Sequence, residues 1–202
     1  MLRADWGADE AKRLTADGRE SSPTRFTPVQ AITVHHTATP VDDPDPDPAA
    51  TVRAIYEQHA VSNDWGNIGY NFLIDRQDVI YECRFSGNDG IPAHNADDEV
   101  VTAFHTFGFN PGNIGIALLG DFNKAKPSPR MRDSLVRLTA SLAARHKLDP
   151  LAGVTYLSPT SGKSTDGPSL GGHQDWTSTE CPGTAAYLDL TDIRERAAGL
   201  VR

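Results

Sequence analysis

The chain is poor in the residues that mark several common classes of protein. Its 202 residues include only two cysteines, Cys83 and Cys181, which excludes the disulfide framework of a small secreted domain. No apolar run approaches the roughly 18 residues of a membrane-spanning helix, so we expect no membrane insertion. Basic residues number 19 against 27 acidic ones, and the net charge of -8 disfavours a nucleic-acid partner, because phosphate attracts a basic face.

The first residues, MLRADWGADEAKRL, lack the hydrophobic stretch of a signal peptide. Three alternatives stay open: the peptide was removed, it never existed, or the chain is a piece of a longer protein. Residues 1–30 are polar and broken by Pro23 and Pro28. We expect them to form an N-terminal arm that packs through Trp6 on a domain at 31–202.

The composition itself is that of a globular domain, with 38% apolar and 23% charged residues. Strand-like and helix-like segments alternate, which predicts one α/β domain with a central mixed sheet flanked by helices. The predicted strands lie at 31–36, at 113–122, and at 68–75 and 79–84, which form a hairpin around 76–78. Helices are expected after the caps Asp47-Pro48 and Ser128-Pro129, the second with a stripe of Met131, Leu135, Leu138 and Leu142.

Three further segments complete the expected domain. An acidic, proline-rich loop spans 41–48. A loop rich in Gly, Ser, Pro and Thr spans 155–172, with room for a short hairpin, and leads to His173. The chain ends in a helix in which Ile193, Ala197 and Leu200 share one side.

The histidines and one cysteine form the pattern with the most chemical content. His173 and Cys181 are eight residues apart, and a tandem pair, His35-His36, lies far upstream. Zinc binds imidazole and thiolate, and a catalytic zinc has three protein ligands with water in the fourth position. No second cysteine is near enough in sequence to complete a structural site. The pattern indicates a metallohydrolase with one Zn²⁺, unless a disulfide to Cys83 removes Cys181 from the site.

The strand at 31–36 favours His35 over His36 as the upstream ligand. Side chains alternate along a strand, so His36 shares a face with Ile32 and Val34, which we expect to be core. That assignment makes His36 a packed or hydrogen-bonded residue. His59 falls at helical spacing from Val52, Ile55 and Tyr56, and we expect it to pack rather than to bind metal.

Seven short sequence motifs in this chain resemble those of a known protein family. VHHTA, DWGNIGYNFLID, VIYECR, AHN, FNPGNIGIALLGDFN, GGHQDW and TECPG occur in the order seen in type 2 N-acetylmuramoyl-L-alanine amidases. That family includes peptidoglycan recognition proteins and T7-lysozyme-like phage amidases. RADWGAD at 3–9 resembles the start of the recognition-protein domain, so the resemblance covers nearly the whole chain. It implies a peptidoglycan-recognition-protein-like fold.

The resemblance also implies roles for particular residues. His35, His173 and Cys181 match the zinc ligands of the family, while Tyr70 and Thr179 match residues that donate hydrogen bonds to the oxyanion or help to activate the water. The implied reaction is hydrolysis of the amide between the lactyl group of N-acetylmuramic acid and L-alanine in bacterial peptidoglycan. We expect the protein to be a monomer that works outside the cell or in the cell wall, as a secreted amidase or a phage lysin.

The substrate-binding residues are less well defined by the resemblance. It implies substrate contacts at Arg84 and Phe85, whereas His94 matches a groove-edge position with two alternatives, a substrate contact or a structural hydrogen bond. Cys83 stands where the family often has glycine, and we expect a small buried thiol there. Phe85 and Ser86 leave open whether lysine or diaminopimelate is preferred in the stem peptide.

Two other functions compete with a zinc amidase. One is a non-catalytic peptidoglycan-binding module, although receptors of that kind typically lack the Cys ligand that this chain keeps. The other is a cysteine hydrolase that uses Cys181 as the nucleophile with a histidine base, since Pro182-Gly183 follows Cys181 where a helix begins. That mechanism gives the His35–His173 pair no role.

Overall fold

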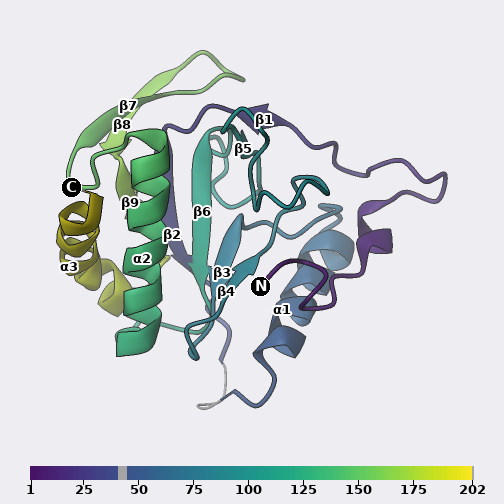
Figure 1. Cartoon of the computed structure of the whole chain (residues 1–202), viewed down its shortest axis with the longest axis horizontal. Coiled ribbons are helices and arrows are strands. Elements are labelled where there is room, and N and C mark those ends of the chain that lie inside the picture. Colours follow the sequence, from purple (N-terminus) through teal and green to yellow (C-terminus); the bar gives the residue numbers. More distant parts are fainter. Residues whose placement is uncertain (41–44, 202) are drawn as a thin grey trace.

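The computed structural model describes residues 1–40 and 45–201, and a five-stranded sheet forms its centre (Figure 1). The strand order is β4-β3-β6-β2-β9. These strands span Ile80–Glu82 (β4), Phe72–Ile74 (β3), Asn113–Leu118 (β6), Ala31–His36 (β2) and Leu170–Gly172 (β9). Three of the strand pairs are parallel, namely β3–β6, β6–β2 and β2–β9. The edge strand β4 pairs with β3 in the antiparallel direction. The predicted mixed sheet of an α/β domain is therefore confirmed.

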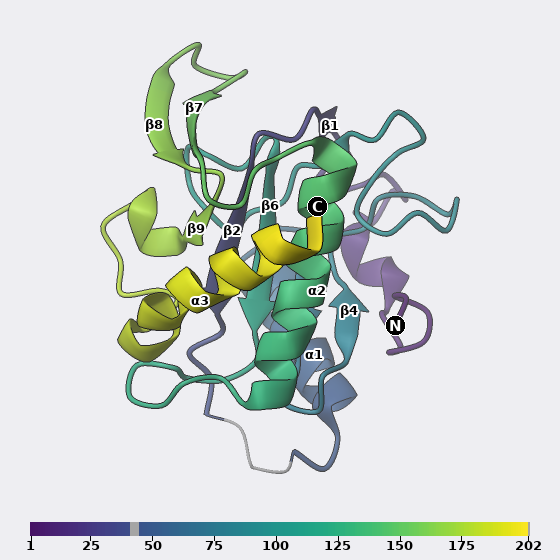
Figure 2. The same ribbon diagram turned by 60° about the vertical axis from the view of Figure 1, so that its left-hand side comes forward.

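Two layers cover the sheet on opposite faces (Figures 1 and 2). Helices α2 (Pro129–His146) and α3 (Thr184–Val201) cover the face that carries Ile32 and Val34 of β2. Helix α1 (Pro48–Glu57) and the N-terminal segment cover the other face, beside Leu73 and Ala117. Because β2 lies between two strands and under both layers, all six of its residues are buried.

The helix starts follow from their caps. Asp47 accepts a hydrogen bond from the backbone N–H of Ala50 at 3.0 Å, and Pro48 is the first helical residue of α1. Ser128 caps α2 in the same way through the N–H of Met131 at 3.2 Å. Both predicted helix starts are confirmed. Of the acidic loop predicted at 41–48, residues 41–44 lie outside the described residues.

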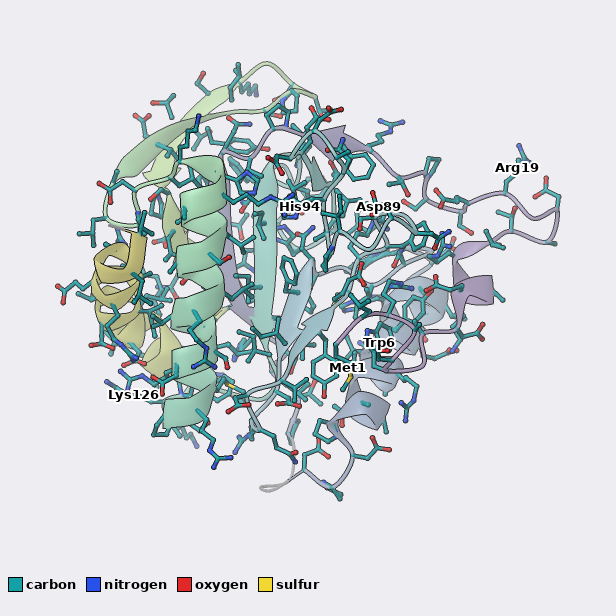
Figure 3. The ribbon with its side chains drawn as sticks, viewed as in Figure 1. Met1, Trp6, Arg19, Asp89, His94 and Lys126 are labelled. Atoms are coloured by element: carbon teal, nitrogen blue, oxygen red, sulfur yellow. The ribbon has the colours of Figure 1, made fainter. Side chains whose placement is uncertain are left out.

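Residues 1–30 lie against the domain at several points. Trp6, labelled in Figure 3, is buried. Its indole N–H donates to the Glu82 carbonyl at 2.8 Å, and its ring meets Tyr56 edge-on. The segment also holds a 3₁₀ helix, η1 (Glu10–Arg13), and a two-residue strand, β1 (Phe26–Thr27), which pairs with β5 (Val100–Val101). Trp6 thereby packs in the cluster on the α1 side of the sheet, whereas Phe26 and Val101 pack with the cluster on the α2 side.

The segment predicted as a loop at 155–172, with room for a short hairpin, does take part in one. The hairpin consists of β7 (Gly153–Leu157) and β8 (Ser164–Pro168) and projects from the domain (Figure 2). The sheet strand β9, which follows it, was not expected. Gly171 and Gly172 have no side chains that could form an alternating pattern, so a strand was not predictable here. Their lack of a Cβ is required here, since a Cβ on Gly172 would come within 2.8 Å of the Tyr187 ring.

The predicted C-terminal helix is confirmed as α3. Of the three residues expected to share one side, Ile193 and Ala197 are buried, whereas Leu200 near the end of the helix is 60% exposed. The last turn of α3 contacts the core through Val201 instead, which follows Ala197 by one helical turn and leaves Leu200 beside the contact. Within the described part of the chain, no helix combines the length and the apolar character that crossing a membrane requires.

Candidate metal centre

The sheet register brings His35 and His173 together. β2 and β9 are parallel neighbours, and Val34 lies opposite Gly172. Each of these two residues is followed by a histidine, His35 after Val34 and His173 after Gly172. After β9 the chain turns through the short 3₁₀ helix η3 (His173–Asp175), which Asp175 closes by accepting from the N–H of Gly172 at 2.7 Å. His35 lies on the same face as Ala117, its partner in β6, and therefore opposite to Ile32 and Val34.

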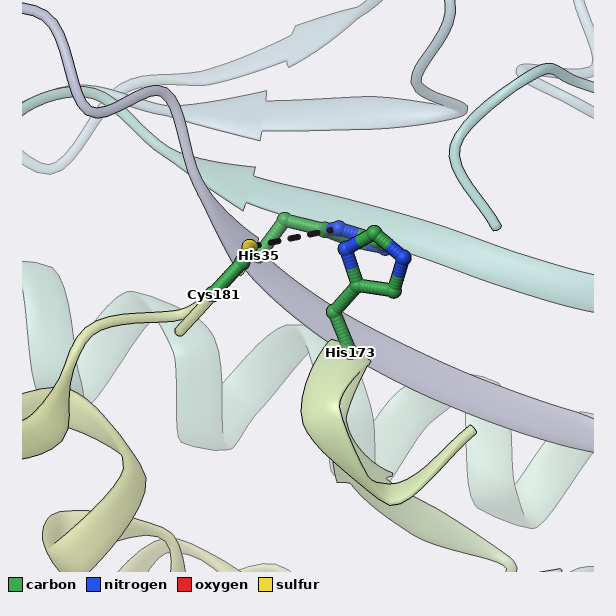
Figure 4. A group of neighbouring side chains, drawn as sticks. All are labelled: His35, His173 and Cys181. Atoms are coloured by element: carbon green, nitrogen blue, oxygen red, sulfur yellow. Dashed lines mark hydrogen bonds between the residues drawn. The ribbon is translucent and has the colours of Figure 1, made fainter. Parts of the chain in front are cut away.

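Cys181 reaches the two histidines from the loop before α3. Its carbonyl accepts from the N–H of Gln174, and its Sγ lies 3.4 Å from the backbone nitrogen of His36. Figure 4 shows the thiol and both imidazoles pointing toward one another. Their ligand atoms all lie within 4.8 Å of each other. Among the residues that the structure describes, this is the only such group of three or more histidine, cysteine or carboxylate ligands.

The spacing of these atoms fits a zinc ion. His35 Nδ1 and Cys181 Sγ are 3.6 Å apart. Tetrahedral zinc with Zn–N of about 2.05 Å and Zn–S of about 2.3 Å places nitrogen and sulfur about 3.6 Å apart. The His35 and His173 rings are 4.6 Å apart between centroids. With three protein ligands, the site leaves a fourth position open.

Burial sets the protonation of the cluster. It lowers the pKa of both His35 and His173, so the imidazoles are neutral and have a lone pair for a metal at pH 7. Burial also raises the pKa of Cys181 to about 11. A thiol with a raised pKa is a poor nucleophile, which argues against the cysteine hydrolase. Cys181 and Cys83 are both free thiols, and Cys83 is buried as predicted.

The two histidines that we expected to pack do so. His36 Nδ1 accepts a hydrogen bond from the N–H of Phe122 at 3.2 Å, on the face opposite to His35. His59 Nδ1 accepts from the N–H of Gly69 at 3.0 Å, and its ring contacts Trp65 and Tyr70.

Tyr70 and Thr179 line the cavity that contains the three ligands, which has a volume of about 480 Å³. The Tyr70 ring lies 5.5 Å from that of His35, and burial raises the Tyr70 pKa, so its phenol stays protonated and can donate. Thr179 Oγ1 accepts from the N–H of Cys181 at 3.3 Å, which leaves the hydroxyl hydrogen free to point elsewhere. The structure therefore brings both predicted donors to the cluster.

The three predicted substrate-binding residues lie elsewhere. Arg84 is 1% exposed, donates to the Ser22 carbonyl and hydroxyl, and its guanidinium lies over the Phe104 ring. The guanidinium of Arg13 lies over the Phe85 ring, with its central carbon 3.5 Å from the ring centroid. His94, labelled in Figure 3, is fully buried. Its Nε2 lies 2.9 Å from His146 Nε2, and its Nδ1 lies 2.9 Å from the Pro92 carbonyl oxygen. Buried side chains cannot touch a polymer, so Arg84 and His94 do not fit substrate contact, and His94 fits the structural hydrogen bond.

A third histidine, His105, lies at the centre and was not among the predicted site residues. His105 Nδ1 lies 3.0 Å from His35 Nε2, the ring nitrogen that faces away from Cys181. A possible signal was Gly115, a glycine inside an apolar strand, because such a glycine often marks the close approach of another group. A Cβ on Gly115 would lie 2.5 Å from the His105 ring.

A second hollow continues from the cavity. This groove has a volume of about 780 Å³ and shares Trp65, Phe104, His105, His173 and Thr179 with the cavity. Its other lining residues come from the N-terminal segment and three loops: Ser21, Ser22, Asp64, Phe107, Asn110, Thr177 and Ser178. Phe107 is 93% exposed at its rim. An extended molecule lying in the groove would reach the candidate metal centre.

Comparison with known proteins agrees with the motifs. The pattern of the N-acetylmuramoyl-L-alanine amidase family (Amidase_2) matches residues 25–184. Peptidoglycan-recognition protein SC1a/b of Drosophila simulans is 31% identical over 190 residues, which cover 94% of this chain and 83% of that protein. Human N-acetylmuramoyl-L-alanine amidase is 29% identical over 163 residues, covering 79% of this chain and 23% of that protein. The chain therefore belongs to the Amidase_2 family.

The fold agrees as well. The structure of Drosophila PGRP-LB superposes with a TM-score of 0.67 at 24% identity, covering 95% of this chain and 91% of that one. This likeness confirms the predicted peptidoglycan-recognition-protein-like α/β fold.

Proposed function

We propose that this member of the Amidase_2 family hydrolyses the amide between the lactyl group of N-acetylmuramic acid and L-alanine in peptidoglycan. One zinc ion held by His35, His173 and Cys181 would serve the reaction. The observation that carries the proposal is the convergence of these three ligands in one cavity that Tyr70 and Thr179 also line. A module that only bound peptidoglycan would need neither the ligands nor the donors.

Zinc, when bound, supplies a nucleophile at neutral pH, because it lowers the pKa of water from about 16 to about 7, and it polarises the scissile carbonyl. The chain supplies the remaining functions. His35 and His173 are neutral and buried, so they bind the metal without first losing a proton. The thiol of Cys181 must lose its proton on binding, which makes metal affinity fall at low pH.

Tyr70 and Thr179 act on the substrate oxygen. When water attacks the amide carbon, negative charge develops on the carbonyl oxygen, and a neutral O–H group can stabilise that charge by donating to it. Removing one such donor typically costs about 3–4 kcal/mol of transition-state stabilisation. The protonated phenol of Tyr70 meets this requirement.

The groove provides the approach for a polymer. It joins the cavity along five shared lining residues, and its rim carries the exposed ring of Phe107. Peptidoglycan lies outside the cytoplasm, so the proposed site of action is the cell wall or the extracellular space, and a monomer is sufficient for the reaction.

Release of amino groups from purified peptidoglycan tests the proposal. The zinc-loaded protein should release one new α-amino group per cleaved amide without releasing new reducing sugar ends. Chelation should stop the release and added zinc should restore it, while Cys181→Ser should stay inactive with zinc present. If the zinc-loaded protein sediments with peptidoglycan but releases no amines, it is a binding module. If alkylation inactivates a metal-free, active protein, it is a cysteine hydrolase.

A further inference from the structure

We propose that His105 is a positioning residue that holds His35 in the tautomer with its lone pair on Nδ1, the atom that faces Cys181. It would thereby set the metal affinity of the centre. The inference rests on the proposed function only insofar as His35 is a metal ligand. It assigns His105 no contact with the substrate.

Two hydrogen bonds in series carry this inference. His105 Nε2 lies 3.0 Å from the backbone carbonyl oxygen of Asn113, and His105 Nδ1 lies 3.0 Å from His35 Nε2. A carbonyl oxygen only accepts, so His105 Nε2 carries the hydrogen. The Nδ1 of the neutral ring is then an acceptor, and His35 Nε2 must donate to it. The lone pair of His35 is consequently on Nδ1, 3.6 Å from Cys181 Sγ.

A neighbouring hydroxyl does not reverse this order. Thr106 Oγ1 lies 2.9 Å from His105 Nδ1 and can either donate to that nitrogen or rotate its hydrogen away. If Thr106 accepted from Nδ1 instead, His105 Nε2 would be unprotonated and would face the Asn113 carbonyl with two acceptors 3.0 Å apart. The Asn113 carbonyl in β6 therefore determines which atom donates in both hydrogen bonds, from His105 to Asn113 and from His35 to His105.

The His105 ring is held in place from two sides. Asn110 Oδ1 accepts from the backbone N–H groups of His105 and Thr106, at 2.9 and 2.7 Å, which fixes the loop. On the other side the ring rests on Gly115, where a Cβ would approach to 2.5 Å. Because β6 is the direct neighbour of β2, this contact places the ring beside His35.

The expected consequence is a tighter metal site. Histidines that bind metals usually donate their second N–H to a carbonyl, a carboxylate or water, and loss of that partner typically weakens metal binding about 10- to 100-fold. In this chain the partner is an imidazole that is itself anchored to a carbonyl.

Two substitutions of His105 separate its two hydrogen bonds. In His105→Asn the side-chain oxygen can take the place of Nδ1 and accept from His35. In His105→Gln the side-chain nitrogen can take the place of Nε2 and donate to Asn113, but no acceptor remains for His35. His146→Gln is the matched control, because it removes an imidazole from the His94–His146 pair outside the centre.

Zinc affinity is the first measurement, by competition with a chromogenic chelator at pH 7.5. We expect the Kd to rise about 10- to 100-fold in His105→Gln and considerably less in His105→Asn. The Kd of His146→Gln should equal that of the wild type. Gly115→Ala, which moves the ring without removing it, should weaken binding in the same direction as His105→Gln. Circular dichroism verifies that each variant is folded.

The tautomer of His35 is the second measurement, by long-range ¹H–¹⁵N NMR on the zinc-free protein. His35 should carry its hydrogen on Nε2 in the wild type and in His105→Asn, and should populate both tautomers in His105→Gln. An unchanged tautomer together with an unchanged Kd in His105→Gln would overturn the proposal. Since this measurement needs neither zinc nor peptidoglycan, failure of the amidase proposal would leave its outcome intact.

Discussion

Among the described residues, two close pairs of histidines differ in what surrounds them. In one pair His35 and His105 have ring nitrogens 3.0 Å apart, and in the other His94 and His146 have ring nitrogens 2.9 Å apart. The first pair has a third histidine and a thiol beside it and opens into a cavity. The second pair joins a loop to the last turn of α2, and nearby side chains are Arg145 and Asp98.

This difference shows that close histidines do not by themselves make a metal site. His94 Nδ1 donates to the Pro92 carbonyl, so its Nε2 accepts from His146 and both ring nitrogens are occupied. His35 uses only Nε2 in its pair, and its Nδ1 faces Cys181 Sγ at 3.6 Å. The first pair therefore has a ring nitrogen, His35 Nδ1, that faces the Cys181 thiol in the cavity. The second pair only connects two parts of the fold.

The largest effect should come from removing a ligand. Cys181→Ala, His35→Ala and His173→Ala should each reduce bound zinc from one ion per chain to near zero, because two remaining ligands do not hold the ion. Activity on peptidoglycan should disappear with the metal. Inductively coupled plasma mass spectrometry after desalting gives the stoichiometry. His94→Ala and His146→Ala are the matched controls, and loss of zinc in either of them would contradict the contrast between the pairs.

The next largest effect should follow removal of a donor without removal of the metal. Tyr70→Phe should keep one zinc per chain and lower kcat roughly 100- to 1,000-fold, because a single oxyanion donor contributes about that much. Tyr156→Phe is the control, since it removes a buried phenol that donates to the Pro111 carbonyl, outside the cavity. An unchanged kcat in Tyr70→Phe would remove that residue from the mechanism.

A smaller effect, on stability alone, should follow disruption of the second pair. His146→Ala leaves a buried ring nitrogen of His94 without its partner, which should lower the free energy of unfolding by about 1–3 kcal/mol. Urea unfolding followed by tryptophan fluorescence measures the change. The zinc Kd should stay at the wild-type value, and a Kd that rose with the loss of stability would show that the two pairs are coupled.

The smallest effect should be a pH dependence of that stability. Burial lowers the pKa of His146 from 6.5 to about 4, and burial lowers the pKa of His94 as well. The unfolded chain therefore binds these protons first, so the stability contribution is complete above pH 6.5 and decreases as the pH falls toward 4. The difference in unfolding free energy between wild type and His146→Gln should shrink over that interval. A difference that stayed constant from pH 7 to pH 4.5 would contradict the prediction.

Much of this site could be predicted from local patterns in the sequence. Alternation along β2 selected His35 over His36, and the GGHQDW and TECPG motifs supplied His173 and Cys181. Strand alternation at His35 is a local property, whereas the two motifs identified His173 and Cys181 without any geometry. The helix starts at Asp47-Pro48 and Ser128-Pro129 were predictable for the same reason, because a cap is defined by the few residues beside it.

The remaining features depend on contacts between distant segments. The AHN motif drew attention to His94, whereas His105, eleven residues later, is the histidine that β6 holds beside His35. Only the pairing of β6 with β2 distinguishes the two. β9 was missed because Leu170–Gly172 has almost no side chains to form a pattern, and its strand geometry comes from its neighbour β2.

Mass spectrometry of a defined muropeptide decides whether this histidine–cysteine centre cleaves the proposed amide. The substrate is N-acetylmuramic acid carrying a stem peptide, in one lysine and one diaminopimelate version, incubated with zinc-loaded protein in H₂¹⁸O. We expect free N-acetylmuramic acid with one ¹⁸O in its lactyl carboxylate and an intact stem peptide with a free L-alanine amino terminus. Intact muropeptide in both versions, or ¹⁸O incorporated at any other bond, would contradict the proposed cleavage.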